Sequence, residues 1–174
     1  MFAMKKYVII VIFLMSCFSV GAQSQNSQSI VNDLIEKVDS LEHELSYLKL
    51  SYEISMFNSD LRIFRSEVNH KAYEIQSNML NKIFDDELYE AYSKFYNGCL
   101  QQQEALMEAR EVKKLYFTLK IMTSPFNESE FNILMASYNM IDNEFDTLKT
   151  TMDYLKKHIE VYKKYLLRYK AVES

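Results

Sequence analysis

The sequence predicts an all-α fold, a bundle of three long antiparallel helices. The chain of 174 residues contains two glycines and one proline, too few for the many tight turns of a β-rich fold. Apolar residues recur at alternating spacings of three and four along most of the chain, which is the period of packed helices. Residues typical of helix starts separate these apolar series. We expect the first helix either to extend as a coiled-coil stalk or to fold back as a fourth helix.

The first helical region is expected to run from about residue 29 to residue 84, in two halves. Residues 30 to 55 carry a strict heptad seam with Glu and Lys beside it, as in a coiled coil. The seam residues are Val31, Leu34, Val38, Leu41, Leu45, Leu48 and Tyr52. From residue 57 the apolar series drifts towards the 3.6-residue period of a straight helix. Serine and asparagine residues gather at the changeover, between residues 51 and 59, and predict a kink or break there.

The second helix is expected over residues 86 to 122. Asp85 and Asp86 precede it, and their side chains can cap its first N–H groups. Gly98 lies inside this region, and a glycine costs a helix about 1 kcal/mol relative to alanine, which is not enough to end it. We therefore expect one helix, with Gly98 as the place for any bend. Its apolar series is Leu88, Tyr92, Phe95, Cys99, Leu106, Ala109, Val112, Tyr116 and Leu119.

The third helix has the most regular pattern in the chain. Pro125 interrupts what precedes it, Asn127 can accept from free N–H groups, and Glu130 stands three residues later, as in a capping box. Twelve apolar residues then follow at alternating spacings of three and four, which predicts one long helix with a packed seam. They are Phe131, Leu134, Tyr138, Ile141, Phe145, Leu148, Met152, Leu155, Ile159, Tyr162, Leu166 and Tyr169.

The three expected helices differ in length. If unbroken, the first would be about 80 Å long at 1.5 Å per residue, against about 55 Å and 65 Å for the second and third. The other two helices cannot cover it fully, which is why a stalk or a fourth helix is expected. The expected organisation is a signal peptide at residues 1–22, a flexible tether at 23–29, a coiled-coil segment at 30–55 and a helical bundle at 56–174.

The N-terminal residues predict export. Lys5 and Lys6 precede an apolar run of about 14 residues, which is the pattern of a secretory signal peptide and too short to span a bilayer. Residues 20 to 22, Val-Gly-Ala, form a cleavage site that would leave a soluble chain beginning at Gln23. A competing lipobox, Leu-Met-Ser before Cys17, would instead leave a lipid-anchored chain. We favour the soluble form because apolar residues continue after Cys17.

Composition argues against several function classes. The whole chain has 20 basic and 24 acidic residues, and loss of Lys5 and Lys6 with the signal would change its net charge from −4 to −6. Such an acidic chain has no general attraction for nucleic acid. Cys99 would be the one cysteine left, so neither a disulfide framework nor a zinc site is expected. The glycine-rich phosphate loop, the dinucleotide-binding turn and the Gly-x-Ser-x-Gly elbow are absent from the sequence, and we expect no enzyme activity and no cofactor.

Two local features suggest chemistry but have simpler interpretations. Glu67 and His70 have the Glu-x-x-His spacing of di-iron helical bundles, but a second such motif is missing, so we expect a solvated helix face and no metal site. Cys99 follows Phe95 in an apolar series and is interpreted as a buried small hydrophobe. Three scattered histidines supply no expected partner for a Cys/His nucleophile.

Two surfaces remain as candidates for binding. The C-terminal part of the third helix combines lysines and tyrosines in a strip that suits anions or a protein partner, although cations beside a heptad seam are also expected for packing alone. Its residues are Lys156, Lys163, Lys164, Tyr165 and Arg168. The other candidate is self-association to a homo-oligomer through residues 30 to 55. The central seam residues there are Leu34, Val38, Leu41, Leu45 and Leu48.

We therefore expect an exported, non-enzymatic helical protein that acts through helix-mediated contact with a protein partner in the bacterial cell envelope. It would be periplasmic or extracellular, with a lipid-anchored envelope protein as the alternative, and no membrane span is expected in the mature chain. The alternative function is a bundle that binds a small apolar ligand. An apolar cavity on the order of several hundred Å³ would favour the ligand. A filled core with an exposed apolar groove would favour the protein partner.

Overall fold

The computed structural model describes the backbone of residues 24 to 173 and the side chains of residues 28 to 172. The predicted signal peptide, both predicted cleavage sites and Cys17 lie outside these residues. The described chain consists of three helices, α2 (Ser24–Leu80), α3 (Asp86–Thr123) and α4 (Glu128–Glu173). It divides into two compact units, Met1–Glu44 and Leu45–Ser174.

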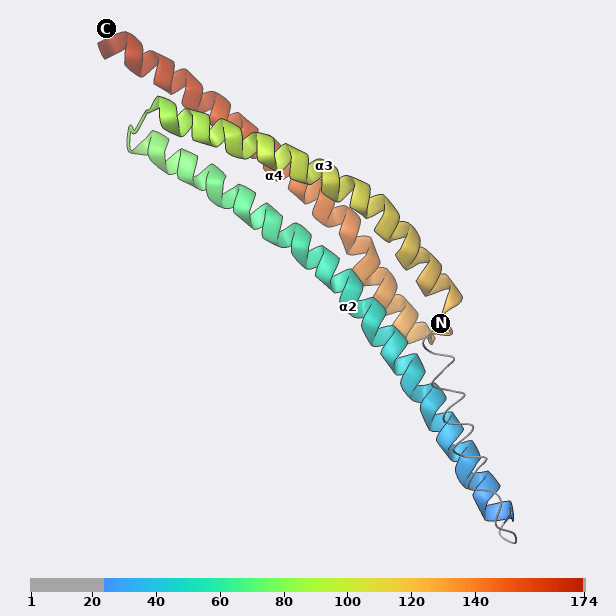
Figure 1. Cartoon of the computed structure of the whole chain (residues 1–174). Helices are drawn as coiled ribbons and strands as arrows, with labels where there is room; N and C mark the ends of the chain where they lie inside the picture. The colour runs from blue at the N-terminus through green and yellow to red at the C-terminus, as the bar shows by residue number, and fades with distance from the viewer. Residues whose placement is uncertain (1–23, 174) are drawn as a thin grey trace. The chain divides into compact units, whose positions relative to one another are not determined.

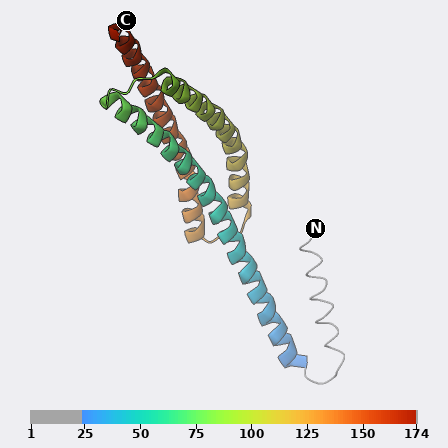
Figure 2. The same ribbon diagram turned by 60° about the vertical axis from the view of Figure 1, so that its left-hand side comes forward.

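The second unit is an antiparallel bundle of three long helices, so the predicted fold class is confirmed. The chain reverses direction in the connection between α2 and α3 and again between α3 and α4 (Figure 1). Figure 2 shows the same two reversals from a second side. As a result, α3 runs against both of its neighbours, and α4 runs in the direction of α2 within this unit.

The core of the bundle follows the predicted seam of α4. Nine of its twelve residues are buried: Leu134, Ile141, Phe145, Leu148, Met152, Leu155, Ile159, Tyr162 and Leu166. Phe131 and Tyr138 are partly buried against them, and Tyr169 near the end of the helix is 43% exposed. The three-four spacing therefore predicted the buried face of α4 correctly.

α2 contributes a second row of core side chains, and this row begins before residue 57. Leu50 and Ile54 are already buried, with 4% and 0% exposure. Tyr47, one turn earlier, packs edge-on against Phe126 of the α3–α4 connection, with ring centroids 6.1 Å apart. The buried residues that follow are Phe57, Leu61, Phe64, Val68, Ala72 and Ile75. The bundle thus includes residues that we had assigned to the coiled-coil segment.

The predicted break between residues 51 and 59 does not occur, because α2 is a single helix from Ser24 to Leu80. Neither glycine nor proline lies in this stretch to interrupt the backbone hydrogen bonds. Asn58, one of the residues that suggested the break, is 5% exposed, and its Nδ2 donates a 2.9 Å hydrogen bond to the carbonyl of Ser137 in α4. This polar residue marks a contact between helices instead of a helix end.

The predicted starts of α3 and α4 are confirmed. The Asp85 side chain caps α3, because its Oδ1 accepts from the backbone N–H groups of Glu87 and Leu88 at 2.7 and 3.1 Å. Asn127 and Glu130 form the reciprocal capping box of α4, since each side chain accepts from the backbone N–H of the other residue at 3.0 Å. Both caps satisfy N–H groups that a helix cannot pair internally.

The predicted buried face of α3 is wrong in the second half of the helix. Val112 and Leu119 are 71% and 60% exposed, whereas Phe117 and Ile121 are buried. The core-facing side also holds Arg110, whose side chain pairs with α4. Because the core-facing side mixes charged with apolar residues and the outer side also carries apolar residues, hydrophobicity alone did not identify the buried face.

In the first unit, the described residues all belong to α2. Residues 24 to 29, which we expected in a flexible tether, are helical. Residues 24 to 173 contain three helices and their two connections, and residues 30 to 55 belong to α2, so they do not form a separate fourth helix. Within this part of the chain, no helix has both the length and the apolar character required to span a membrane.

The predicted coiled-coil seam is exposed on α2. The exposed fractions are 46% for Leu34, 39% for Val38, 62% for Leu41, 66% for Leu45, 60% for Leu48 and 64% for Tyr52. In the bundle unit, the last three of these residues lie almost opposite Leu50 and Ile54, because successive residues are rotated by about 100° around a helix with 3.6 residues per turn. This part of α2 therefore has two apolar faces, one in the core and one in solvent.

Candidate protein-interaction site

A surface groove of about 550 Å³ lies where α2 ends and α3 begins. The last turns of α2, the α2–α3 connection and the C-terminal half of α4 form its walls, and it is open to solvent. Its lining residues are Gln76, Met79, Leu80, Lys82, Phe84, His158, Val161 and Tyr165. We call it the α2–α4 groove.

Aromatic rings form one wall of the α2–α4 groove. Phe84 stacks on Tyr165 with a centroid distance of 5.8 Å and an interplanar angle of 18°. Its ring also lies 5.7 Å from that of Tyr162 and 5.9 Å from that of Tyr169. These three tyrosines follow each other on α4 at spacings of three and four, so they lie along one side of the helix. Phe84 thereby packs the α2–α3 connection against α4.

Hydrogen bonds hold this connection in place. The hydroxyl of Tyr162 accepts from the backbone N–H of Asp85 at 3.0 Å. One layer further in, Tyr92 meets Tyr162 edge-on at 5.3 Å, and its hydroxyl accepts from Nδ2 of Asn78 at 2.6 Å. Burial raises the pKa of both tyrosines, so both hydroxyls stay protonated at neutral pH. The hydroxyls of Tyr162 and Tyr92 are therefore both hydrogen-bonded behind the wall of the groove.

The backbone just after α2 takes an unusual conformation. Lys82 has a φ of 56°, which lies in the left-handed region that residues with a β-carbon seldom adopt. The N–H of Lys82 bonds to the carbonyl of Met79, and that of Ile83 bonds to the carbonyl of Asn78, which closes the end of the helix. This turn leaves the groove residue Leu80 76% exposed and Ile83 46% exposed.

The structure places the five predicted partner-binding residues on two sides of the buried α4 seam. Tyr165 lines the α2–α4 groove, and Lys164 and Arg168 lie one helical turn from its α4 residues. Lys163 lies on the side of α3 instead, with its Nζ 5.5 Å from the centroid of the Tyr89 ring. Lys156 stands seven residues before Lys163 and shares its side of the helix. The predicted strip is thus divided, and only one part of it borders the groove.

Sequence reasoning missed Leu80 and Phe84 as parts of this site. We expected the first helix to continue to residue 84, whereas it ends at Leu80. Asp85 and Asp86 signalled the start of α3 correctly, but no glycine or proline marks the end of α2. The contacts of Phe84 with the α4 tyrosines join residues far apart in sequence, so no local pattern could reveal them.

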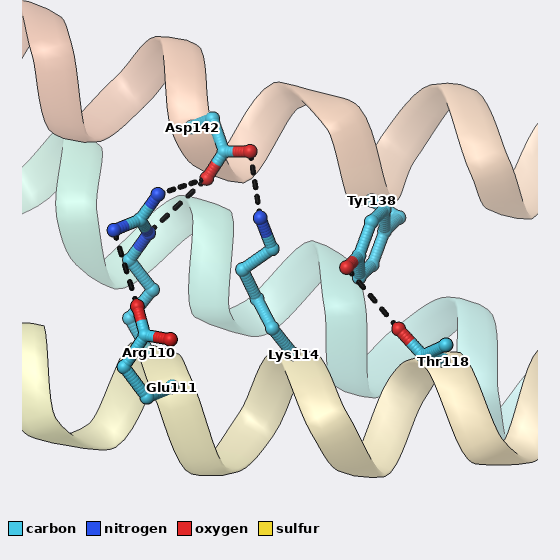
Figure 3. A network of polar contacts seen from close by, with 6 residues as sticks. All are labelled: Arg110, Glu111, Lys114, Thr118, Tyr138 and Asp142. Carbon is cyan, nitrogen blue, oxygen red and sulfur yellow. Dashed lines mark hydrogen bonds and ion pairs between the residues drawn. The ribbon is translucent and has the colours of Figure 1, made fainter.

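A polar network joins α3 to α4 further along the bundle (Figure 3). Nη2 and Nε of Arg110 donate to Oδ1 of Asp142 at 2.5 and 3.1 Å, and Nζ of Lys114 donates to Oδ2 at 2.7 Å. The hydrogen bonds from Lys114 and Arg110 lower the pKa of Asp142. Near one end, Oγ1 of Thr118 donates to the hydroxyl of Tyr138 at 3.1 Å. Arg110 and Lys114 each pair with Asp142, so these contacts fix how α3 and α4 align along their lengths.

A second charged cluster joins α2 to α4. Glu144 is 9% exposed, and its two carboxylate oxygens accept from Nε of Arg62 at 2.6 Å and from Nη1 of Arg65 at 2.7 Å. The neighbouring Asn58 leaves its Oδ1 buried without a hydrogen-bond partner among the described residues. Partly buried ion pairs and buried asparagines of this kind specify how helices align. We interpret both clusters as determinants of helix register.

Cys99 and the Glu-x-x-His pair occupy different environments. Cys99 is 4% exposed, and its burial, with a smaller contribution from the charge of Glu67, raises the pKa of the thiol to about 11. A thiol with this pKa carries almost no nucleophilic thiolate at neutral pH. Glu67 and His70 are exposed and border a separate surface groove between α2 and α3. Within residues 28 to 172, no three His, Cys, Asp or Glu side chains are grouped so that they could hold a metal ion.

No protein-family model, no curated protein and no solved structure matches this chain.

Proposed function

We propose that this protein acts in the bacterial cell envelope through helix-mediated contact with a second protein, without catalysing a reaction. We assign the contact to the α2–α4 groove. The observation that carries the proposal is the exposure of large apolar side chains along a structured groove, with Leu80 at 76% and Tyr165 at 47%. Contiguous exposed apolar surface on a soluble protein is typical of an interaction site.

The form of the groove suits an amphipathic helix as the partner. Such a helix presents apolar side chains at spacings of three and four, which is how helix-in-groove complexes are built. Cationic side chains surround the apolar lining: Lys82 within the groove, and Lys164 and Arg168 beside it. A partner helix with acidic residues flanking its apolar face would complement these charges, which would speed association and select the partner.

The alternative, a small apolar ligand, has less support. The α2–α4 groove is open to solvent and lined by Gln76, Lys82 and His158 as well as by apolar residues. Small-molecule sites are usually concave and bury most of the ligand. An open groove would leave much of an apolar ligand in water, whereas a protein helix brings its own solvent-facing side.

Capture from envelope extracts would test the proposal. Leu80→Asp and Tyr165→Asp should each reduce capture of the partner at least about tenfold, because a charge in the centre of an apolar contact must be desolvated. Leu115→Asp is the matched control, since Leu115 is 73% exposed on α3, away from the groove. Capture that is unchanged by both groove variants, or lost only with Leu115→Asp, would contradict the assignment.

The location of the protein forms the second part of the proposal. We propose that it is exported and soluble in the periplasm or outside the cell, on the strength of the positively charged and apolar N-terminal pattern. Intact-mass measurement of the exported protein would test this. A chain beginning at Gln23 without added mass is the expected result, whereas a chain beginning at Cys17 with a diacyl or triacyl increment would overturn the soluble form.

A further inference from the structure

We infer that α2 forms a parallel, in-register homodimer through its exposed heptad seam. This inference goes beyond the proposed function, because the seam is a separate surface from the α2–α4 groove and its partner is a second copy of this chain. It rests on three observations: the exposure of the seam, the residue types at its core positions, and the match between the residues that flank it.

The seam has the geometry of an unpaired coiled-coil strand. Its residues lie on a single helix; Val31 is half-buried, and the other six are exposed, from Val38 at 39% to Leu45 at 66%. Within the bundle unit, the core is supplied by Leu50 and Ile54 on the other side of α2, so packing in the bundle leaves the seam uncovered. A continuous apolar seam in water is unfavourable, and a second identical seam would cover it along its length.

The residue types at the heptad core positions favour two parallel strands. The a positions are Val31, Val38, Leu45 and Tyr52, and the d positions are Leu34, Leu41 and Leu48. Leucine thus fills every d position, and β-branched Val31 and Val38 fill the first two a positions. This combination, β-branched residues at a with leucine at d, is the one that favours parallel dimers.

The flanking residues match in a parallel, in-register pair. In such a pair, each g residue lies beside the e residue that is five positions later on the other helix, and these contacts set orientation. The three consecutive pairs are Ile30 with Ile35, Lys37 with Glu42, and Glu44 with Lys49. One pair is apolar and two are oppositely charged, and all six residues are exposed. By symmetry the dimer would contain four oppositely charged contacts.

An antiparallel pair matches less well. In that arrangement g residues face g residues and e residues face e residues. Lys37 can then meet Glu44 of the second copy, but Glu42 falls opposite Ile35 in the same register. The dimer would contain two oppositely charged contacts instead of four. Within one chain, Nζ of Lys37 bonds to Asp33 at 2.8 Å. Both side chains are more than half exposed, so this ion pair is weak and competes little with the contact between Lys37 and Glu42 of the second copy.

Sedimentation equilibrium of the purified protein tests dimer formation. The unmodified protein should show a concentration-dependent equilibrium between monomer and dimer, because three heptads form a short contact. Leu41→Glu should weaken association at least about tenfold by placing two charges in the seam. Ser40→Glu is the matched control, since Ser40 is exposed and lies off the seam. A monomer at the highest accessible concentration would overturn the inference, as would equal effects of the two variants.

Charge reversal tests the orientation. Lys37→Glu should weaken the dimer about tenfold at low salt, because in both symmetry-related contacts it places a glutamate beside Glu42 of the opposite copy. Adding Glu42→Lys should restore association, since the pair is opposite in charge again. Both proteins lack the Lys37–Asp33 pair, so its loss cannot explain the rescue. In an antiparallel dimer the second change would not restore association, and that result would overturn the parallel arrangement.

Cross-linking provides an independent measure of register. With Cys17 and Cys99 replaced by serine and alanine, Leu41→Cys should form an intermolecular disulfide readily, because identical d residues face each other in a parallel, in-register dimer. Ser40→Cys should cross-link much more slowly. Equal rates would contradict the inference. The groove variant Leu80→Asp should dimerise like the unmodified protein, so failure of the proposed function would not affect this test.

Discussion

The hydroxyl of Tyr162 in α4 accepts a 3.0 Å hydrogen bond from the backbone N–H of Asp85. Tyr162 is fully buried, and Asp85 is the residue that caps α3. One buried side chain therefore links the C-terminal half of α4 to the first turn of α3 and to the connection that precedes it. Because Phe84 lies in that connection and walls the α2–α4 groove, this hydrogen bond also supports the proposed interaction site.

Tyr162→Phe should destabilise the bundle by about 1 to 2 kcal/mol. The substitution keeps the ring but leaves the N–H of Asp85 without its partner in a partly buried place, and that desolvated donor is the main cost. Chemical denaturation would measure the change in the free energy of unfolding. Tyr73→Phe removes a hydroxyl from a tyrosine that is 62% exposed, and should change stability by less than about 0.5 kcal/mol. Equal effects would contradict the structural role of the hydrogen bond.

Asp142 should make stability depend on acid pH. Its hydrogen bonds with Lys114 and Arg110 lower its pKa below the ordinary value of 3.8. A carboxyl with a lowered native pKa stabilises the fold above its ordinary pKa, and this contribution is lost as the pH falls through the lowered native value. Asp142→Asn should therefore cost about 1 kcal/mol at pH 7, a value that allows for solvent screening of the half-exposed side chain. The difference between the two proteins should shrink in strong acid.

Denaturation curves measured from pH 7 down to about pH 2 would test this prediction, since that range brackets the titration of carboxyl groups. Asp153→Asn, at an exposed position on the same helix, serves as the control and should shift stability little at any pH. A destabilisation by Asp142→Asn that stays constant across the whole range would show that the charge of Asp142 is not responsible.

Cys99 should resist thiol reagents while the protein is folded. Cys99 is 4% exposed and its thiol has a pKa of about 11. At pH 8 the thiol is therefore almost entirely protonated, and a reagent cannot reach it. Labelling with a coloured disulfide reagent should be at least about a hundredfold slower than in denaturant. The reason is that the rate depends on the small fraction of folded molecules that open and expose Cys99. Rapid labelling of the folded protein would contradict the burial of Cys99 in the bundle core.

Gly98→Ala should stabilise α3 by about 0.5 to 1 kcal/mol. Gly98 lies inside the helix with a φ that is not positive, and an added β-carbon would meet no atom within 4 Å. Alanine would thus gain helix propensity and reduce the freedom of the unfolded chain without a clash. The midpoint of thermal unfolding should rise. A decrease would show that the bundle requires a glycine at this position.

The starts of α3 and α4 could be predicted from the sequence because the interactions that define them are local. The Asp85 cap, and the capping box of Asn127 and Glu130, join residues within one turn, and their types and spacing are visible in the sequence. The buried seam of α4 was equally visible, since it is apolar at every core position. The all-α fold and the antiparallel arrangement of long helices followed from these features.

The candidate site was visible only in part. Tyr165 belonged to the predicted strip of cations and tyrosines, and it does line the α2–α4 groove. Lys163 belonged to the same strip but lies against Tyr89 of α3. The composition of the strip does not show which side of the helix each residue faces. The buried seam of α4 separates Tyr165 on one side from Lys163 on the other. Leu80 and Phe84 were not identified, because the end of α2 carries no sequence signal and its contacts are with a distant helix.

The sequence by itself determined where helices form, whereas only the tertiary structure decided which of their faces are buried. In α3 the apolar Val112 is exposed, while Arg110 faces α4 because Asp142 pairs with it. In α2 two apolar faces compete, and the bundle buries the one that carries Leu50 and Ile54. The spacing of apolar and charged residues shows that a helix has an apolar or a charged face. Which face is covered depends on partners that lie far away in the chain, and local spacing contains no information about them.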